Sequence, residues 1–188
     1  MTQPEKTTPA KQKRPSTIDR VRSHCAVYPA TNYTAESMVT MALVIEQMAP
    51  DRDPVELMQF MDWATGRVIG RVSRKVGMPT ETDLFANGLS AIDDVCREKY
   101  AKPFAGLTPS KRRAVLESIE DGNVTTGYWS RVPSDYFYRR FYTKLLHGMF
   151  AERKEWVQIG ILRSADPGES TSTPSTQSNT TGPLTASD

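Results

Sequence analysis

Apolar residues recur at helical spacing through the middle of the chain, where capping residues and prolines divide them into segments. One segment starts after Thr34, repeats an apolar residue every three or four positions, and stops at Pro50. The next starts at Asp53-Pro54, because aspartate suits the N-cap and proline suits the first helical turn. Its apolar stripe continues to Val76, just before a glycine and a proline. The pattern predicts two helices here.

Three more helices are predicted in the second half of the chain. One covers 82–100, one covers 108–122 between a Thr-Pro start and an Asp-Gly stop, and one covers 133–151. The apolar stretch 156–162 has no second strand to pair with, so we expect an extended segment packed on the bundle. The predicted fold class is all-α, an irregular bundle of about five helices.

Composition separates the helical region from two predicted tails. Residues 1–33 are rich in Pro, Thr, Lys and Gln and hold six Lys/Arg against two acids, which predicts a basic, flexible N-terminal segment. In 164–188, seventeen of the 25 residues are Ser, Thr, Pro or Gly, which predicts a disordered tail. The helical domain between them, 34–163, is nearly neutral, with eighteen Lys/Arg against seventeen acids.

The composition also narrows the classes of function. A net charge of +2 does not indicate a nucleic-acid partner. Two histidines and two separated cysteines favour neither a metal site nor a disulfide framework, and Cys96 falls in a helical stripe as a small core residue. No apolar run approaches the roughly 18 residues of a membrane span, and no secretory signal precedes residue 33. We therefore expect a cytoplasmic chain without a membrane span, or a periplasmic or membrane-associated one if a partner exports it.

Charged clusters in the predicted helices show no convergent chemistry, and no catalytic or metal-binding residue is predicted. Adjacent helical residues point about 100° apart, so Asp93 and Asp94 do not converge on one atom and are interpreted as a solvated face. The run Lys111-Arg112-Arg113 lies opposite the apolar stripe of its helix and is interpreted as a patch facing solvent or a partner.

Aromatic residues are densest between Tyr128 and Phe150. One helix face cannot take all of them into a small core, so some are expected to face outward and mark an interface. An ordinary core and a cofactor box are the alternatives, the second without a phosphate loop or ligand set beside it. Gly148 is expected to let another backbone approach closely. The predicted partner-interface residues are Tyr136, Tyr138, Tyr142, His147, Phe150 and Trp156.

Three stretches of the chain together resemble the gluconate 2-dehydrogenase subunit 3 family, over roughly 35–161. The first, MVTMALVIEQMAPDRDPVELMQFMDWA, has an apolar helix, a proline, an acidic linker and an Asp after an aromatic-apolar pair. The second is GLSAIDDVCREKYAKPFAGLTPSKRRAVLESIEDG, which is similar from its Gly-Leu helix to its Glu-x-Gly end. The third, YFYRRFYTKLLHGMFAERKEWVQIGI, is similar in its Phe-rich helix, its Gly before an aromatic and its Trp.

The resemblance implies a non-catalytic small subunit of a membrane-associated or soluble FAD-dependent dehydrogenase for a sugar, sugar acid or polyol. The resemblance also implies that such a subunit supports the folding, maturation and stability of a large GMC-type flavoprotein subunit. FAD is then expected in that partner and no cofactor in this chain, with a cytochrome c subunit as a further partner. Two alternatives stand beside this reading. One is a stand-alone helical adaptor or regulatory protein, and the other is an enzyme in its own right.

Overall fold

The computed structural model describes residues 15–65, 67 and 76–150. Within them every regular element is helical, which confirms the all-α fold class, and the six α-helices are one more than the five or so predicted. The elements are α1 (Thr17–Val27), α2 (Ala35–Met48), α3 (Pro54–Ala64), α4 (Glu81–Tyr100), the 3-10 turn η1 (Phe104–Gly106), α5 (Pro109–Glu120), the 3-10 turn η2 (Gly127–Ser130) and α6 (Ser134–Phe150). The predictions for 156–162 and 164–188 lie outside the described residues.

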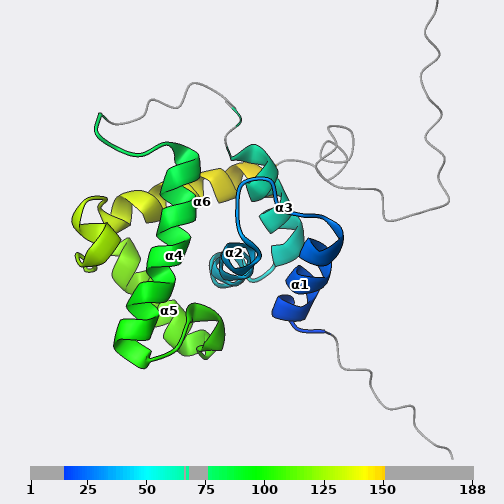
Figure 1. Cartoon of the computed structure of the whole chain (residues 1–188), viewed down its shortest axis with the longest axis horizontal. Coiled ribbons are helices and arrows are strands. Elements are labelled where there is room, and N and C mark those ends of the chain that lie inside the picture. The colour runs from blue at the N-terminus through cyan, green and yellow to red at the C-terminus, as the bar shows by residue number, and fades with distance from the viewer. Residues whose placement is uncertain (1–14, 66, 68–75, 151–188) are drawn as a thin grey trace, which may run out of the picture.

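Helix α2 lies at the centre of the bundle. Residues 38–45 are all buried, so this helix is apolar on every side. Helices α1 and α3 cover one side of it, while α4, η1 and α5 cover the other (Figure 1). A helix that is apolar all round is stable only when other elements surround it. The apolar run of α2 therefore explains why the remaining helices gather around it.

The predicted helix starts are confirmed by their caps. The Thr34 side chain accepts a hydrogen bond from the backbone N–H of Ser37 at 3.1 Å. The Asp53 carboxylate accepts one from the N–H of Val55 at 2.9 Å, with Pro54 as the first helical residue. Each of these bonds satisfies an N–H group that has no partner within its own helix.

Helix α3 ends at Ala64, so the prediction of one unbroken helix that continues to Val76 is wrong at Thr65, and the prediction for 66 and 68–75 lies outside the described residues. Thr65 already has an extended backbone, with φ −71° and ψ 135°. The side-chain amide of Asn32 donates to the carbonyls of Asp62 at 2.7 Å and Thr65 at 3.2 Å. These carbonyls at the end of the helix are thus satisfied by a side chain some thirty residues earlier, so the helix can stop there.

The N-terminal segment contains helix α1, so the predicted flexibility of 1–33 is wrong for 17–27. Ser16 caps the helix, and its side chain accepts from the N–H of Asp19 at 3.2 Å. Val21 is fully buried, and Ile18 and Cys25 pack against the core beside it. These three residues follow helical spacing, and this narrow stripe is enough to dock the helix on α2.

Two glycines allow aromatic rings to enter helix–helix contacts. A Cβ atom at Gly88 of α4 would lie 2.3 Å from Cε2 of Phe137 in α6. A Cβ atom at Gly148 of α6 would lie 2.6 Å from Cδ1 of Phe60 in α3. The close approach predicted at Gly148 is therefore made by a side-chain ring instead of a backbone.

Candidate partner-binding surface

Helix α6 divides its aromatic residues between the core and one surface groove. Phe137 and Phe141 are fully buried and meet Phe85 of α4 edge-on, with ring centroids 6.1 and 5.3 Å away. Tyr138 and Tyr142 lie about 100° further round the helix, where their rings stack with centroids 6.5 Å apart and planes 16° apart. Part of the aromatic density is therefore ordinary core, and part of it lines a surface.

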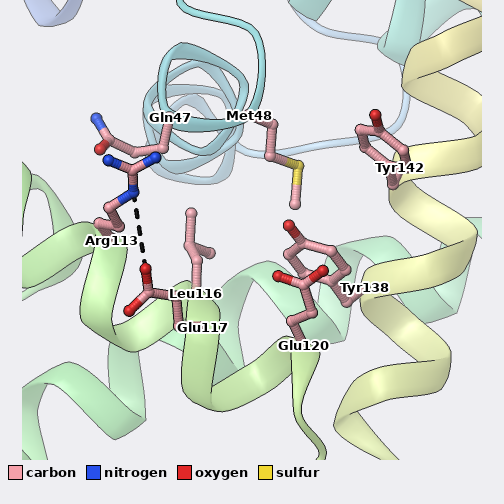
Figure 2. A pocket seen from close by; sticks show the side chains of 8 residues that line it. All are labelled: Gln47, Met48, Arg113, Leu116, Glu117, Glu120, Tyr138 and Tyr142. Carbon is pink, nitrogen blue, oxygen red and sulfur yellow. Dashed lines mark ion pairs between the residues drawn. The ribbon is translucent and has the colours of Figure 1, made fainter.

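A groove with a volume of about 370 Å³ lies between α2, α5 and α6. Met48 of α2 and Leu116 of α5 point into its centre, and the two stacked tyrosines of α6 form one wall (Figure 2). Polar side chains complete the lining, namely Gln47, Arg113, Glu117 and Glu120. The groove thus combines a small apolar centre with aromatic and charged borders.

The charges around the groove are predominantly acidic. Arg113 pairs with Glu117 at 3.7 Å, and both side chains are mostly exposed. Glu120 has no Lys or Arg partner among the described residues, and its carboxylate lies beside the Tyr138 side chain (Figure 2). Burial, together with the nearby carboxylates of Glu120 and Glu117, raises the pKa of Tyr138 to about 12. Two carboxylates therefore lie near the tyrosine hydroxyl, and only Glu117 is paired with a cation among the described residues.

A second groove, of about 470 Å³, lies between α4, α5 and the loop 123–126. Its apolar contacts come from Val95, Val115 and Val124, and Glu98 and Lys99 contribute one charge of each sign. None of its lining residues is aromatic. It therefore offers a weaker recognition surface than the groove beside the tyrosines, since aromatic side chains dominate the energetics of interfaces.

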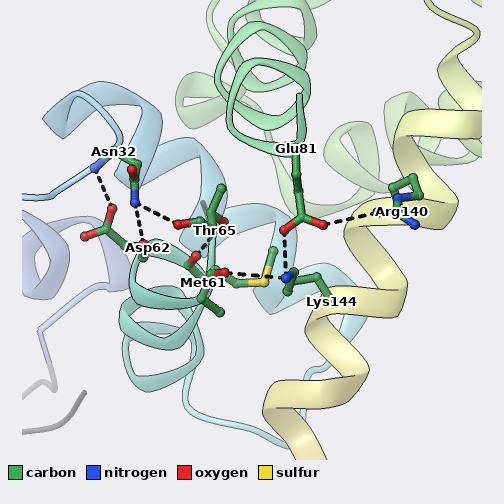
Figure 3. Close-up of polar contacts among 8 residues, drawn as sticks. Asn32, Met61, Asp62, Thr65, Glu81, Arg140 and Lys144 are labelled. Carbon is green, nitrogen blue, oxygen red and sulfur yellow. Dashed lines mark hydrogen bonds and ion pairs between the residues drawn. The ribbon is translucent and has the colours of Figure 1, made fainter. Parts of the chain in front are cut away.

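A buried cluster of charges ties the end of α3 to α4 and α6 (Figure 3). Lys144 of α6 is only 6 % exposed, and its ammonium group donates to Glu81 Oε1 at 2.7 Å. The same ammonium lies 3.5 Å from the carbonyl oxygen of Ala64. Arg140 pairs with Glu81 at 3.3 Å. The carboxylate at the start of α4 therefore has two cationic partners from α6.

A second set of polar contacts fixes the loop before α2 against α3. The Asp62 carboxylate accepts hydrogen bonds from the backbone N–H groups of Thr31 at 2.8 Å and Asn32 at 2.9 Å. Asn32 returns a bond to the Asp62 carbonyl, as Figure 3 shows. The Asp62 side chain is nearly buried, and hydrogen bonds to its charged form compensate for the loss of water.

Burial shifts the pKa of both cysteine thiols and of one histidine among the described residues. Cys25 and Cys96 are both free, and burial raises the pKa of each thiol, that of Cys96 to about 12. Burial also lowers the pKa of His24, against the opposing charge of Asp62. The thiolate is the nucleophilic form, so burial makes both thiols less reactive than an exposed cysteine. The described part of the chain contains no group of three His, Cys, Asp or Glu residues that could hold a metal ion.

A family model for gluconate 2-dehydrogenase subunit 3 matches residues 25–161. The chain belongs to the gluconate 2-dehydrogenase subunit 3 family. No curated protein and no solved structure matches it. The family match begins within α1 and covers α2 to α6, so the groove and the buried charge cluster both belong to the family region. Membership implies an accessory subunit of a dehydrogenase complex.

In this member of the subunit 3 family, the predicted interface residues do not form one patch. Tyr138 and Tyr142 lie together in the groove. Tyr136 packs partly buried against the core, outside the groove lining. His147 and Phe150 are exposed on the last turns of α6, Phe150 to 81 %. The sixth residue, Trp156, lies outside the described residues, so its role stays a prediction.

Two charged runs, one interpreted as a solvated face and one as a patch facing solvent or a partner, each contain one structural residue. Arg112 is 8 % exposed, and its guanidinium donates to the carbonyls of Phe104 at 3.1 Å and Ala105 at 2.9 Å. Asp93 accepts a hydrogen bond from the N–H of Phe104 at 2.8 Å. Both residues therefore hold η1 in place. Their sequence neighbours, Lys111, Arg113 and Asp94, are exposed as predicted.

The residues that complete the groove and the buried cluster were not among the predicted site residues. Met48, Leu116 and Glu120 come from two helices whose approach no local pattern indicates. Lys144 had a local signal, because it occupies the buried stripe of α6 between Phe141 and Gly148. A lysine at a core position of a helix is rarely buried without an acidic partner, and the partner here is Glu81.

None of the helices in the described part of the chain is long and apolar enough to cross a membrane.

Proposed function

We propose that this chain is the non-catalytic small subunit of a flavin-dependent dehydrogenase complex that oxidises a sugar, sugar acid or polyol. The match of the subunit 3 family model to residues 25–161 is the observation that carries the proposal. The partner is a large GMC-type flavoprotein subunit, which holds FAD and the substrate. A cytochrome c subunit that receives the electrons completes the complex.

The small subunit supports the folding, maturation and stability of the large one. A protein that binds only the native state of its partner stabilises that state by mass action, by about 2.7 kcal/mol at a concentration 100 times Kd. The exposed end of α6, with His147 and Phe150, and the groove beside Tyr138 and Tyr142 supply aromatic surface for such binding. Aromatic side chains of this kind are enriched at the centres of interfaces.

The first test is a pulldown of the tagged full chain from its native host at low and high salt. We expect a large second chain in the eluate, together with the absorption bands of a flavin. The eluate should then oxidise a sugar, sugar acid or polyol with an artificial electron acceptor. A colourless eluate that contains the chain alone, soluble and monomeric, would contradict the proposal.

A second test addresses maturation. The flavoprotein identified in the pulldown is expressed with and without this chain, and its soluble yield and flavin content are measured. We expect both to fall when the chain is absent. Equal yield and equal flavin content in the two cultures would rule out a role in maturation, and would leave a purely structural subunit.

A further inference from the structure

We infer that the groove between α2, α5 and α6 is an anchor site for a segment of the large subunit that presents a Lys or Arg side chain beside an aliphatic one. This inference rests on the proposed function, since the segment belongs to the dehydrogenase partner. It assigns to a specific groove what family membership leaves unassigned, namely where the partner docks and which chemistry it presents.

The acidic border of the groove selects the cation. Glu120 has no Lys or Arg partner among the described residues, whereas Glu117 is already paired with Arg113. The groove lining holds the carboxylates of Glu117 and Glu120 against the single guanidinium of Arg113, so acidic groups are in excess there. A lysine or arginine from a partner would complete an ion pair that the isolated chain lacks.

The aromatic wall favours the same occupant. Tyr138 and Tyr142 stack nearly parallel, and Tyr142 is 40 % exposed, so a cation can reach the rings. A cation near a tyrosine face gains electrostatic energy, and the planar guanidinium of arginine also stacks on the ring. In Figure 2 the Glu120 carboxylate lies beside Tyr138, so one incoming cation can meet both groups.

The apolar centre specifies the second half of the motif. Met48 and Leu116 point into the groove between its charged borders. A partner segment that places an aliphatic side chain on these two residues would remove apolar surface from water. Methionine adapts its shape to the group it meets, which suits a contact that forms only on assembly.

A polypeptide segment fits this groove better than a small molecule does. Arg113 and Glu117 border it with side chains that are 75 % and 62 % exposed, so a small ligand would remain largely open to solvent. Binding pockets usually enclose most of the ligand surface. A volume near 370 Å³ holds only a few side chains, whereas a stable interface buries about 800 Å² on each partner. The groove is thus one anchor within a larger interface.

Charge variants of Glu120 test the inference on the full chain. Glu120 is the last residue of α5, where a positive charge favours the helix dipole, so Glu120→Arg does not threaten the fold. Glu98, which lies exposed beside the second groove, supplies the matched controls Glu98→Arg and Glu98→Gln. Far-UV circular dichroism confirms that each variant is folded.

The affinity of each variant is measured against the flavoprotein captured by the wild-type chain, purified and titrated at fixed salt. We expect Glu120→Arg to bind roughly 10- to 100-fold more weakly, Glu120→Gln to lose less, and both Glu98 variants to stay within about twofold of wild type. Equal losses at Glu98 and Glu120, or no loss at Glu120, would overturn the inference while leaving the subunit assignment intact. Failure of the wild-type chain to capture any flavoprotein would overturn both.

A photo-crosslink identifies the occupant directly. The side chain of Tyr142 is replaced by p-benzoylphenylalanine in the full chain, the complex is irradiated, and the crosslinked peptide is sequenced by mass spectrometry. We expect a peptide of the large subunit with a Lys or Arg next to an aliphatic residue. A crosslink to residues 1–14 of this chain or to a second copy of it, or to a large-subunit peptide without a basic residue, would overturn the inference.

Discussion

Helix α4 carries a glycine where helix propensity alone favours alanine. Replacing Gly88 by alanine adds about 1 kcal/mol of helix propensity. The new Cβ atom, however, would lie 2.3 Å from Cε2 and 2.4 Å from Cδ2 of the Phe137 ring. Carbon atoms in a packed interior prefer separations of about 3.5–4.0 Å. The ring must therefore move by more than about 1 Å, or α4 and α6 must separate.

The Phe137 ring has little freedom to move. It is fully buried and packs against Phe85, Trp129 and Phe141, with ring centroids 5.4 to 6.1 Å away. Overpacking of such a core costs about 1–3 kcal/mol, and the aromatic neighbours place this site near the upper end. After the gain in propensity is subtracted, we expect Gly88→Ala to lower the free energy of unfolding by about 1–2 kcal/mol.

Urea unfolding of the full chain, followed by far-UV circular dichroism, measures this change. The matched control is Ser90→Ala, at an exposed position of the same helix, which should raise the free energy of unfolding by a few tenths to about 0.5 kcal/mol. A double-mutant cycle with Phe137→Leu should show coupling of about 1 kcal/mol, because a smaller side chain makes room for the new Cβ. A Gly88→Ala variant as stabilised as Ser90→Ala, or a cycle without coupling, would refute the reasoning.

Three further predictions concern buried and titratable groups. Lys144→Ala is expected to lower the free energy of unfolding, measured by urea unfolding, by about 3 kcal/mol, because it removes a buried cationic partner of Glu81 together with the packing of the lysine side chain. Lys144→Met keeps most of that packing, so it should lower the free energy of unfolding by less in the same assay. Arg112→Lys cannot bond both carbonyls of η1 as a guanidinium does, so urea unfolding should show a loss of about 1–2 kcal/mol, and a loss below about 0.5 would contradict this role. Burial lowers the pKa of His24, so the unfolded state binds its proton first and stability falls as the pH drops below about 6.5. His24→Gln should reduce this fall in a series of urea titrations between pH 7.5 and 5, whereas an unchanged profile would exclude His24 as its source.

Local chemistry predicted the helix starts in 34–122. The Thr34 cap needs only the three residues that follow it. Asp53-Pro54 combines a side-chain acceptor with a preset backbone angle. Thr108-Pro109 starts α5 at the predicted position, although its threonine side chain makes no capping bond, so the proline is the stronger of the two signals there. These features act within one turn, and a single sequence contains all the information they need.

Contacts distant in sequence decided the boundaries that were predicted wrongly. The apolar stripe of α3 continues past Thr65 in the sequence, but Asn32 binds the carbonyls of Asp62 and Thr65, and the backbone at Thr65 is extended. Helix α1 has low overall hydropathy and one fully buried residue, Val21, so composition made it resemble a flexible tail. Both errors arise because tertiary contacts add stability that local pattern and composition do not report.

One part of the candidate site was predictable from local sequence, and the other part depends on contacts between residues distant in sequence. Helical spacing alone places Tyr138 and Tyr142 on one stripe of α6, beside the stripe of Phe137 and Phe141, so their pairing was predictable. The sequence could not indicate that the tyrosine stripe faces Met48 and the acidic end of α5, because that depends on how three helices meet. Since Phe141 is fully buried and Tyr142 is 40 % exposed, adjacent residues of one helix serve the core and the surface separately. Partner binding at the tyrosines can therefore vary without loss of the aromatic core that holds α6 in place.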